Sequence, residues 1–377
     1  MKQIKMVDLK GQYDKIKNEI DEAIREVIES TSFINGPQVK IFQKELEKYL
    51  SVKHVIPCAN GTDALQVSMM SLNLQPGDEI ITTSFTFIAT VEVIALLKLV
   101  PVLVDVLPDT FNIDPEAVRK AITPKTKAIV PVHLFGQCAD MEAIMAIASE
   151  FNLFVIEDAC QSIGAEYIFN NGIRKKSGTI GDIGCTSFFP SKNLGCYGDG
   201  GAIFTNDDEL AHKIRMIVNH GMLNRYYHDV IGVNSRLDSI QAAILSAKLK
   251  HLDEYIQARQ KAADYYDKAF NNHPKLKIPA RSINSTHVFH QYTLKIIDEN
   301  RNELQKFLEQ KGIPSMVYYP VPIHLQKAYK TLQYKEGDLP ITEHLCNSVI
   351  SLPMHTELDE YQLKYITDTV LQYFNNN

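Results

Sequence analysis

Seven short β-rich runs follow one another between residues 54 and 205, separated by helical or turn segments. Two of them are apolar at consecutive positions, Ala128-Ile129-Val130 and Leu153-Phe154-Val155-Ile156. Consecutive apolar residues are typical of strands that are covered on both faces in a mostly parallel sheet. We therefore predict an α/β fold with a mostly parallel seven-stranded sheet flanked by helices. The predicted strands are His54–Cys58, Glu79–Thr83, Val102–Val106, Ala128–Val132, Phe154–Asp158, Cys185–Phe188 and Ala202–Thr205.

Helical patterns precede and follow this alternating region. Apolar residues recur at helical spacing between Lys15 and Ser30, and Asn35-Gly36-Pro37 then interrupts the pattern. One long helix is predicted from about Leu237 to Phe270, leading into shorter segments beyond Pro274. We assign residues 1–250 to a large domain with the N-terminal helix and residues 251–377 to a smaller C-terminal α/β domain. The segments predicted for the smaller domain are a strand within Val288–Ile297 and helices at Arg301–Lys311 and Asp359–Phe374.

The charge balance and the cysteines exclude several classes of protein. The 377 residues include 39 Lys and Arg against 45 Asp and Glu, and there is no basic run, which argues against nucleic acid or an anionic membrane as the main partner. The longest apolar segment, Val91–Val106, is interrupted by charged residues and is shorter than the roughly 20 residues of a membrane helix. The N-terminus has no signal-like apolar stretch. Six scattered cysteines without a C-x-x-C pair or a His cluster predict reduced thiols, no metal and a cytoplasmic location.

The first motif that suggests chemistry is Asn60-Gly61-Thr62-Asp63-Ala64-Leu65, which follows the first predicted strand and opens a helix. A helix N-terminus presents unpaired N–H groups and the positive end of the helix dipole, so Gly61 and Thr62 are candidates for holding a phosphate. The same residues also suit an ordinary helix cap that needs no ligand. Both interpretations stay open on this motif alone.

The second candidate is Asp158, at the end of an apolar strand, with Gln161 three residues later. Ligand sites in parallel sheets lie at the carboxyl ends of the strands, and a carboxylate placed there can pair with a pyridinium nitrogen. The alternative is that Asp158 caps a following helix.

The third candidate is Lys192, in a turn that runs from Ser187 to Gly195 and is followed by Gly198-Asp199-Gly200-Gly201. A lysine in such a turn can reach a cofactor aldehyde and form a Schiff base. Most lysines are solvated surface charges. Lys192 is distinguished by the phosphate-cradle candidate and the strand-end acid that precede it in the chain.

Taken together, these motifs resemble the pyridoxal-phosphate nucleotide-sugar aminotransferases of the DegT/StrS type, within the fold-type I aminotransferases. The resemblance extends from Asp8-Leu9 to Ser351-Leu352-Pro353-Met354-His355. It rests on six runs that agree at once: Asn60 to Leu65, Ser84-Phe85-Thr86-Phe87, Glu157 to Ser162, Ser187 to Asn193, Gly198 to Gly201, and Gly232 to Asp238.

The resemblance implies pyridoxal 5′-phosphate (PLP) as the cofactor and residues 1–250 as the domain that binds it. Lys192 and Asp158 would be catalytic: Lys192 would attach to the cofactor and shuttle a proton, and Asp158 would pair with the pyridine nitrogen. Asn234 would reach the cofactor phosphate from the neighbouring subunit, so the active site would belong to a homodimer. The other implied cofactor contacts are Phe87 stacked on the ring, Gln161 near the ring hydroxyl, and Gly61, Thr62 and Ser187 on the phosphate.

The run from Ser187 to Gly201 looks like the group that aminates C-3 of UDP-2-acetamido-2-deoxy-3-oxo-glucuronate, with glutamate as the expected donor, for surface polysaccharides such as the O-antigen of lipopolysaccharide. Arg236 of the second subunit would bind the sugar carboxylate, because a guanidinium matches a carboxylate bidentately. Tyr319 would also contact the substrate. Two positions depart from that group: Asn193 stands where Pro is expected, and Tyr318 where His is expected.

These departures keep other acceptors open, namely a dTDP-linked 3-keto or 4-keto-6-deoxy sugar. An alternative that is not an enzyme is a regulator of the same fold that senses a ligand without catalysis. The presence of Lys192 together with Asp158 argues against it. A PLP dehydratase of this fold is disfavoured, because such relatives carry His in place of the lysine.

Overall fold

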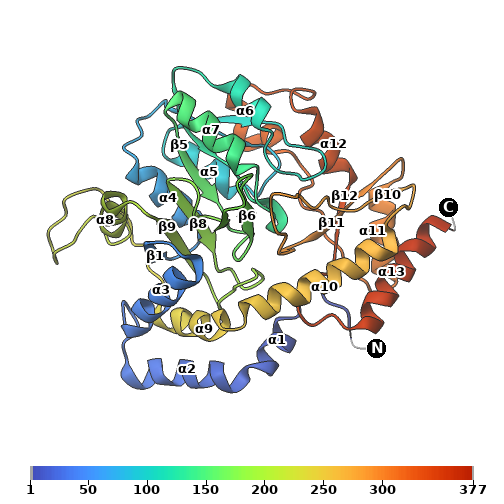
Figure 1. Ribbon diagram of the computed structural model, residues 1–377, viewed down its shortest axis with the longest axis horizontal. Helices are drawn as coiled ribbons and strands as arrows, with labels where there is room; N and C mark the ends of the chain where they lie inside the picture. Colours follow the sequence, from blue (N-terminus) through green and yellow to red (C-terminus); the bar gives the residue numbers. More distant parts are fainter. Residues whose placement is uncertain (1–2, 376–377) are drawn as a thin grey trace.

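A seven-stranded sheet lies at the centre of the structure, a computed structural model that describes residues 3–375 (Figure 1). Its strand order is β1-β9-β8-β5-β4-β2-β3. Strands β8, β5, β4, β2 and β3 run parallel, and β9 is antiparallel to both of its neighbours. The predicted α/β fold with a mostly parallel seven-stranded sheet is confirmed. The strands are β1 (His54–Cys58), β2 (Glu79–Thr83), β3 (Val100–Val104), β4 (Thr126–Val130), β5 (Phe154–Asp158), β8 (Ile183–Ser187) and β9 (Gly201–Thr205).

Strands β3 and β4 each begin and end two residues before their predicted positions. Val106 and Val132 follow these strands, are buried, and form only isolated bridges to Ile113 and Asp158. The apolar run thus continues past the end of the strand into a buried loop. An apolar pattern reports burial, and it does not show where the hydrogen-bonded ladder stops.

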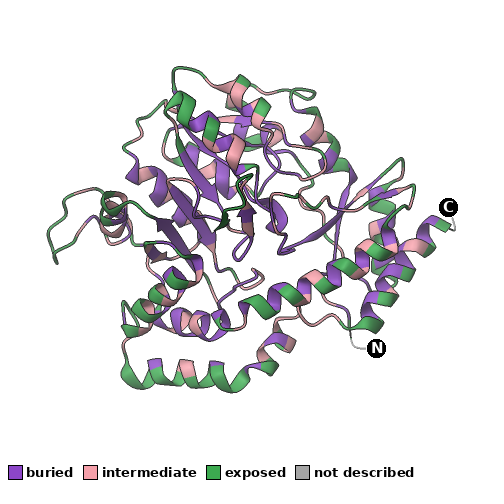
Figure 2. Cartoon of the chain, in the orientation of Figure 1, coloured by how far each residue is buried: buried purple, intermediate pink, exposed green. Residues whose placement is uncertain are grey.

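Both faces of the sheet are covered, as Figure 2 shows by the buried strands at the centre. Val55 and Val155 face one core, which includes side chains of α3, α6, α7 and α9, whereas the adjacent Ile56 and Ile156 face a second core, formed with α4 and α8. Successive side chains of a strand point to opposite faces, so two neighbouring apolar residues in one strand are both buried.

Helices alternate with strands from β1 to β5, and further helices precede and follow this region. The predicted N-terminal helix corresponds to α2, and a short helix that was not predicted, α1, precedes it. The predicted helix from Leu237 to Phe270 is broken at Lys250 and His251. That break separates α9, packed on α2 and α3, from α10, whose C-terminal half joins a third core in the C-terminal part of the chain. No Gly or Pro marks it in the sequence. The helices are α1 (Leu9–Lys15), α2 (Lys17–Ser30), α3 (Pro37–Leu50), α4 (Gly61–Ser71), α5 (Ala89–Leu96), α6 (Pro115–Ala121), α7 (Met141–Phe151), α8 (Asp208–Ile217), α9 (Ser239–Leu249) and α10 (Leu252–Phe270).

The C-terminal part forms a smaller antiparallel sheet, β10-β11-β12, which lies with α10, α11 and α13 at the right of Figure 1. One apolar core joins these elements, and Ile4 from the N-terminal segment packs into it. No helix within residues 3–375 is long and apolar enough to cross a membrane. The remaining elements are β6 (Glu166–Ile168), β7 (Arg174–Lys176), β10 (Leu276–Lys277), β11 (Tyr292–Ile296), α11 (Arg301–Gln310), α12 (Pro340–Ser348), β12 (Val349–Leu352) and α13 (Glu360–Asn375).

Candidate active site

A cavity of about 570 Å³ opens beyond the carboxyl ends of β1, β2, β5 and β8. This is where a parallel α/β sheet is expected to hold its ligand. Eight of the ten predicted site residues line it: Gly61, Thr62, Phe87, Asp158, Gln161, Ser187, Lys192 and Tyr319. In the described range 3–375, no group of three or more His, Cys, Asp or Glu side chains is placed to hold a metal ion.

The turn between β1 and α4 forms one wall of the cavity. Helix α4 begins at Gly61, and Asn60 caps it by accepting the N–H of Asp63 at 2.8 Å. A Cβ atom at Gly61 would lie 2.7 Å from that of Ser187, so glycine lets the helix N-terminus approach the end of β8. The cap and the phosphate cradle predicted here are compatible, because the cap uses the N–H of Asp63 while Gly61 and Thr62, the first residues of the helix, line the cavity.

Asp158 is buried at the end of β5, and both of its carboxylate oxygens have a donor. The hydroxyl of Thr90 donates to Oδ2 at 2.8 Å, and the backbone N–H of Cys160 donates to Oδ1 at 3.2 Å. The helix-cap interpretation of Asp158 is wrong, because residues 159–165 form turns that lead into β6. The side chain is instead held with its carboxylate at the cavity.

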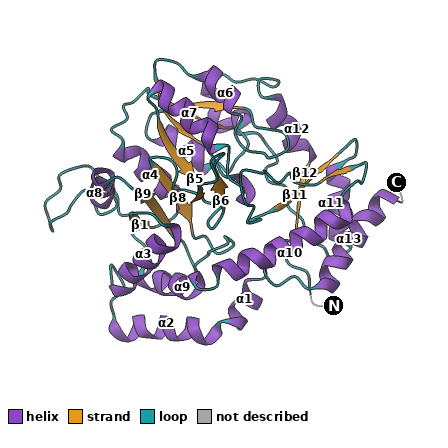
Figure 3. Cartoon of the chain, in the orientation of Figure 1, coloured by secondary structure: helices purple, strands orange, loops and turns teal. Residues whose placement is uncertain are grey.

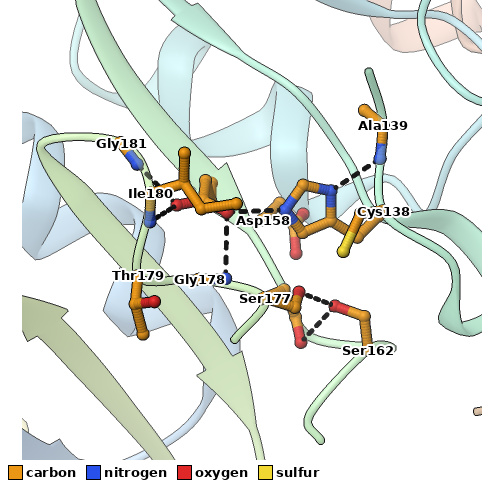
Figure 4. A network of polar contacts seen from close by, with 12 residues as sticks. Cys138, Ala139, Asp158, Ser162, Ser177, Gly178, Thr179, Ile180 and Gly181 are labelled. Atoms are coloured by element: carbon orange, nitrogen blue, oxygen red, sulfur yellow. Dashed lines mark hydrogen bonds and ion pairs between the residues drawn. The ribbon is translucent and has the colours of Figure 1, made fainter. Parts of the chain in front are cut away.

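A network of polar contacts supports β5 next to Asp158 (Figure 4). The fully buried carboxylate of Glu157 lies 2.8 Å from Nε2 of His133, while Nδ1 of His133 accepts the N–H of Ala139 at 3.1 Å. Nε2 therefore carries the proton and donates to Glu157. Glu157 also accepts three backbone N–H groups, from Gly178 at 2.9 Å, Ile180 at 2.6 Å and Gly181 at 2.6 Å.

The loop after β8 carries Lys192 and is closed by its own backbone. The N–H of Lys192 donates to the carbonyl of Phe189 at 2.8 Å, and the N–H of Cys196 donates to the carbonyl of Phe188 at 2.8 Å. These two bonds fold residues 188–196 into a compact turn with Lys192 on the cavity wall.

The Lys192 amine is shifted toward its neutral form. Burial lowers its pKa below the ordinary lysine value, and the nearby Cys160 and Asp158 oppose that shift. A lowered pKa makes an amine a better nucleophile at neutral pH.

Gln161 and Tyr319 form a fixed pair across the cavity. The amide Nε2 of Gln161 lies 3.2 Å from the hydroxyl of Tyr319, and its Oε1 accepts the N–H of Phe135 at 2.9 Å. Burial raises the pKa of Tyr319, so its phenol stays protonated. Both side chains can therefore serve as hydrogen-bonding groups in defined orientations.

Asn193 and Tyr318, the two residues that differ from the group acting on the UDP-linked uronate, both lie at the site. The buried amide of Asn193 donates to the carbonyl of Val288 at 2.9 Å, a bond that fixes the Lys192 loop and that a proline has no side-chain group to form. Tyr318 lines the cavity beside Tyr319.

Asn234 and Arg236 do not line the cavity of their own chain. They flank Ser235, whose hydroxyl accepts the N–H of Ala59 at 3.1 Å, so the segment lies beside the turn that precedes Gly61. Their contribution from a second subunit stays a prediction.

Several residues of the site were not predicted from the sequence. The hydroxyl of Thr86 and Nδ1 of His290 line the cavity region as buried polar atoms without a hydrogen-bond partner in the described chain. Burial lowers the pKa of His290 well below its usual range, so its imidazole is neutral. Thr90 was missed because nothing near it in the sequence reveals that α5 faces the end of β5.

A sequence model of the DegT/DnrJ/EryC1/StrS aminotransferase family matches residues 14–371. The chain belongs to this family. The aminotransferase is 48% identical over 363 residues to the UDP-2-acetamido-2-deoxy-3-oxo-D-glucuronate aminotransferase of Pseudomonas aeruginosa, covering 96% of this chain and 98% of that protein. It is also 48% identical over 373 residues to a protein of Geobacillus stearothermophilus named pleiotropic regulatory protein, covering 98% of each.

The aminotransferase has the same fold as relatives whose structures have been solved. The crystal structure of S. venezuelae DesV in complex with a ketimine intermediate superposes with a TM-score of 0.95 at 37% identity, covering 99% of each chain. The predicted fold-type I architecture, the enzymatic nature of the chain and PLP as its cofactor follow from these relationships.

The cavity fits PLP on its own geometry. A carboxylate, an amine of lowered pKa and a helix N-terminus stand around one space, as a pyridine nitrogen, an aldehyde and a phosphate require. The close approach of Gly61 to Ser187 and the unpartnered hydroxyl of Thr86 are further features of a site shaped for a polar ligand. When bound, PLP supplies an electron sink for bonds broken at the amino-bearing carbon.

Proposed function

We propose that this aminotransferase transfers an amino group from glutamate to C-3 of UDP-2-acetamido-2-deoxy-3-oxo-glucuronate, in the synthesis of surface polysaccharides such as lipopolysaccharide O-antigen. The observation that carries the proposal is the convergence of Lys192, Asp158 and the N-terminus of α4 on one cavity. The acceptor is supported by the P. aeruginosa relative of that name. Donor and acceptor would use the cavity in turn, which gives ping-pong kinetics.

The proposed roles follow from where the side chains lie. Lys192 binds the cofactor and moves a proton to and from the amino-bearing carbon of the substrate, for which its lowered pKa is suited. Asp158, oriented by Thr90, holds the proton on the pyridine nitrogen. Tyr319 orients the substrate. Gly61, Thr62 and Ser187 hold the phosphate, while Phe87 and Gln161 contact the ring.

We further propose that the active enzyme is a homodimer in which Asn234 and Arg236 complete the partner's site. The loop between α8 and α9, residues 218–238, projects away from the sheet (Figure 3). It exposes large apolar side chains, with Tyr226 75% and Ile231 88% exposed. Phe87 is also exposed although it lines the cavity. A second copy of the chain would cover these surfaces.

We also propose the division into two domains and a cytoplasmic location. Residues 1–250 hold most of the two cores around the large sheet, to which Leu252, Ile256 and Val288 are additions. Residues 251–377 hold most of the third core, to which Ile4 is an addition from the N-terminal segment. The six cysteines are free, as expected for the reducing cytoplasm.

The regulatory alternative is supported only by the names of relatives, among them that of the Geobacillus protein. It is not favoured, because a ligand sensor does not need an amine of lowered pKa next to a carboxylate at the carboxyl edge of the sheet.

A panel of UDP- and dTDP-linked 3-keto and 4-keto sugars, each with glutamate and PLP, tests the proposal. We expect formation of 2-oxoglutarate and an amino sugar with the UDP-linked uronate at the highest kcat/KM, and no product with Lys192→Ala. The Lys192→Ala protein should still bind PLP but should no longer be fixed to it by borohydride. Turnover by Lys192→Ala would refute the site, and a preference for a dTDP-linked 6-deoxy sugar would refute the acceptor.

A further inference from the structure

A buried lysine outside the cavity contacts the loop that carries Lys192. Lys248 lies on α9 and is 1% exposed. Its Nζ donates to the carbonyl of Gly195 at 2.5 Å and lies 5.4 Å from the centre of the Tyr197 ring. In the part of the chain that the structure describes, no carboxylate pairs with this group.

An ammonium group buried without a carboxylate is costly to the folded state. Burial lowers the pKa of Lys248 to about 8, and the neighbouring Arg259 charge acts in the same direction. An apolar side chain of similar shape avoids this cost. Folding stability therefore does not account for a lysine at this position.

The hydrogen bond from Lys248 to Gly195 holds the loop of residues 188–196, whose backbone is tightly packed. A Cβ atom at Gly195 would lie 2.4 Å from the carbonyl oxygen of Pro190 and 2.8 Å from that of Phe189. Gly195 is thus packed directly against the residues that precede Lys192, and it lies inside the turn closed by the bond between Cys196 and Phe188. A displacement of the Gly195 carbonyl would shift the backbone on both sides of Lys192.

We propose that Lys248 is a positioning residue for Lys192: its hydrogen bond to the Gly195 carbonyl ties the closed loop to α9 and fixes the direction from which the Lys192 amine enters the cavity. The bond between Asn193 and Val288 ties the same loop on its other side. The two anchors come from different elements, so the loop is held between α9 and the segment before β11. The inference rests on the proposed role of Lys192.

Two substitutions of Lys248 and one matched control test this role. Lys248→Met keeps the stem and removes the donor, whereas Lys248→Gln keeps a neutral N–H donor. Lys213→Met is the control, because Lys213 also donates to a backbone carbonyl, that of Ser71 at 2.7 Å, but belongs to α8 and does not line the cavity.

Hydrogen exchange is measured on the full protein loaded with pyridoxamine 5′-phosphate, a cofactor form that leaves Lys192 without a covalent bond to it. In Lys248→Met we expect the amides of residues 188–197 to exchange about tenfold faster, with the rest of the chain unchanged. We expect kcat to fall about 10- to 100-fold with little change in KM, because a misplaced amine slows the proton transfer more than it weakens substrate binding. Lys248→Gln should recover part of the loss, and Lys213→Met should match wild type.

Faster exchange over the whole chain, or a normal kcat despite a loosened loop, would overturn the positioning role. So would wild-type exchange and kcat in Lys248→Met. If Lys248→Met does not fold, Lys248→Gln is compared with wild type instead. The glutamine amide forms a weaker hydrogen bond to Gly195, so exchange should become faster in residues 188–197 only. A failure of the proposed function is recognised separately, because Lys192→Ala would then turn over substrate.

Discussion

The hydroxyl of Thr90 lies 2.8 Å from Oδ2 of Asp158 and fixes the rotation of that carboxylate together with the N–H of Cys160. Thr90→Val keeps the branched shape of the side chain and removes the donor. We expect kcat to fall about 10- to 150-fold, since hydrogen bonds to charged groups contribute about 1.5–3 kcal/mol. Thr90→Ser, which keeps a hydroxyl, is the control. An unchanged kcat in Thr90→Val would mean that Cys160 alone orients the acid.

The network around Glu157 predicts a large effect on stability. In Glu157→Gln an amide N–H₂ group would replace one oxygen that now accepts backbone N–H groups, leaving buried donors unpaired (Figure 4). We expect the free energy of unfolding to fall by about 2–4 kcal/mol, measured by denaturant titration. The control is Glu150→Gln, because Glu150 pairs with Arg119 at the surface and its loss should change stability by at most about 1 kcal/mol. Equal effects of the two changes would contradict this account.

The strands and the cavity could be predicted from the sequence because both depend on local patterns. Apolar runs locate β1, β2 and β5, and the strand-end rule places Asp158 and Lys192 at one edge of the sheet. The contacts of Thr90 and Lys248 could not be predicted, because their partners are 68 and 53 residues away. Such contacts depend on how α5 and α9 are packed, and hydrophobic periodicity does not specify packing.

The break between α9 and α10 was missed for a similar reason. It occurs without Gly or Pro, just before a helix that begins in the core of the large sheet, with Leu252 and Ile256, and ends in the core of the small one. Tertiary packing overrides a continuous helical pattern there.

Lys248 predicts a pH-dependent contribution to stability. Its pKa is about 8 in the folded protein against an ordinary 10.5, so between these values the unfolded chain binds more protons and the free energy of unfolding rises with pH. The other titratable groups around it keep their charge state below about pH 9: burial raises the pKa of Cys196 to about 11 and of Tyr197 to about 12, and it lowers the pKa of Arg259 only to about 10.

Lys248→Met removes this contribution. The melting temperature of the variant minus that of wild type should therefore decrease from about pH 7 to about pH 9, because wild type alone gains stability from Lys248 across that range. Thermal unfolding at several pH values measures the difference. A constant difference would show that Lys248 does not carry a buried charge.

The proposed dimer predicts complementation between two inactive variants. A heterodimer of Lys192→Ala and Asn234→Asp contains one site with an intact Lys192 and an intact Asn234 from the other subunit. Random mixing should therefore restore about a quarter of the wild-type activity, since half of the dimers are mixed and each has one complete site. Activity is assayed in the random mixture and again after separating the tagged heterodimer, which should show about half of the wild-type activity because one of its two sites is complete. No recovery in demonstrated heterodimers would place Asn234 in its own subunit's site or outside any site.

Arg236 distinguishes a uronate acceptor from the other acceptors. If Arg236 binds the sugar carboxylate, Arg236→Lys should weaken the UDP-linked uronate about 10- to 150-fold, because a point ammonium does not reproduce the two parallel hydrogen bonds of a guanidinium. A matched 6-deoxy sugar on the same nucleotide has no carboxylate, so its kcat/KM should change little in Arg236→Lys. The measurement is kcat/KM for wild type and Arg236→Lys on the two substrates. An equal loss on both would show that Arg236 contacts a phosphate or the subunit interface, and the uronate would then have to be recognised by another group.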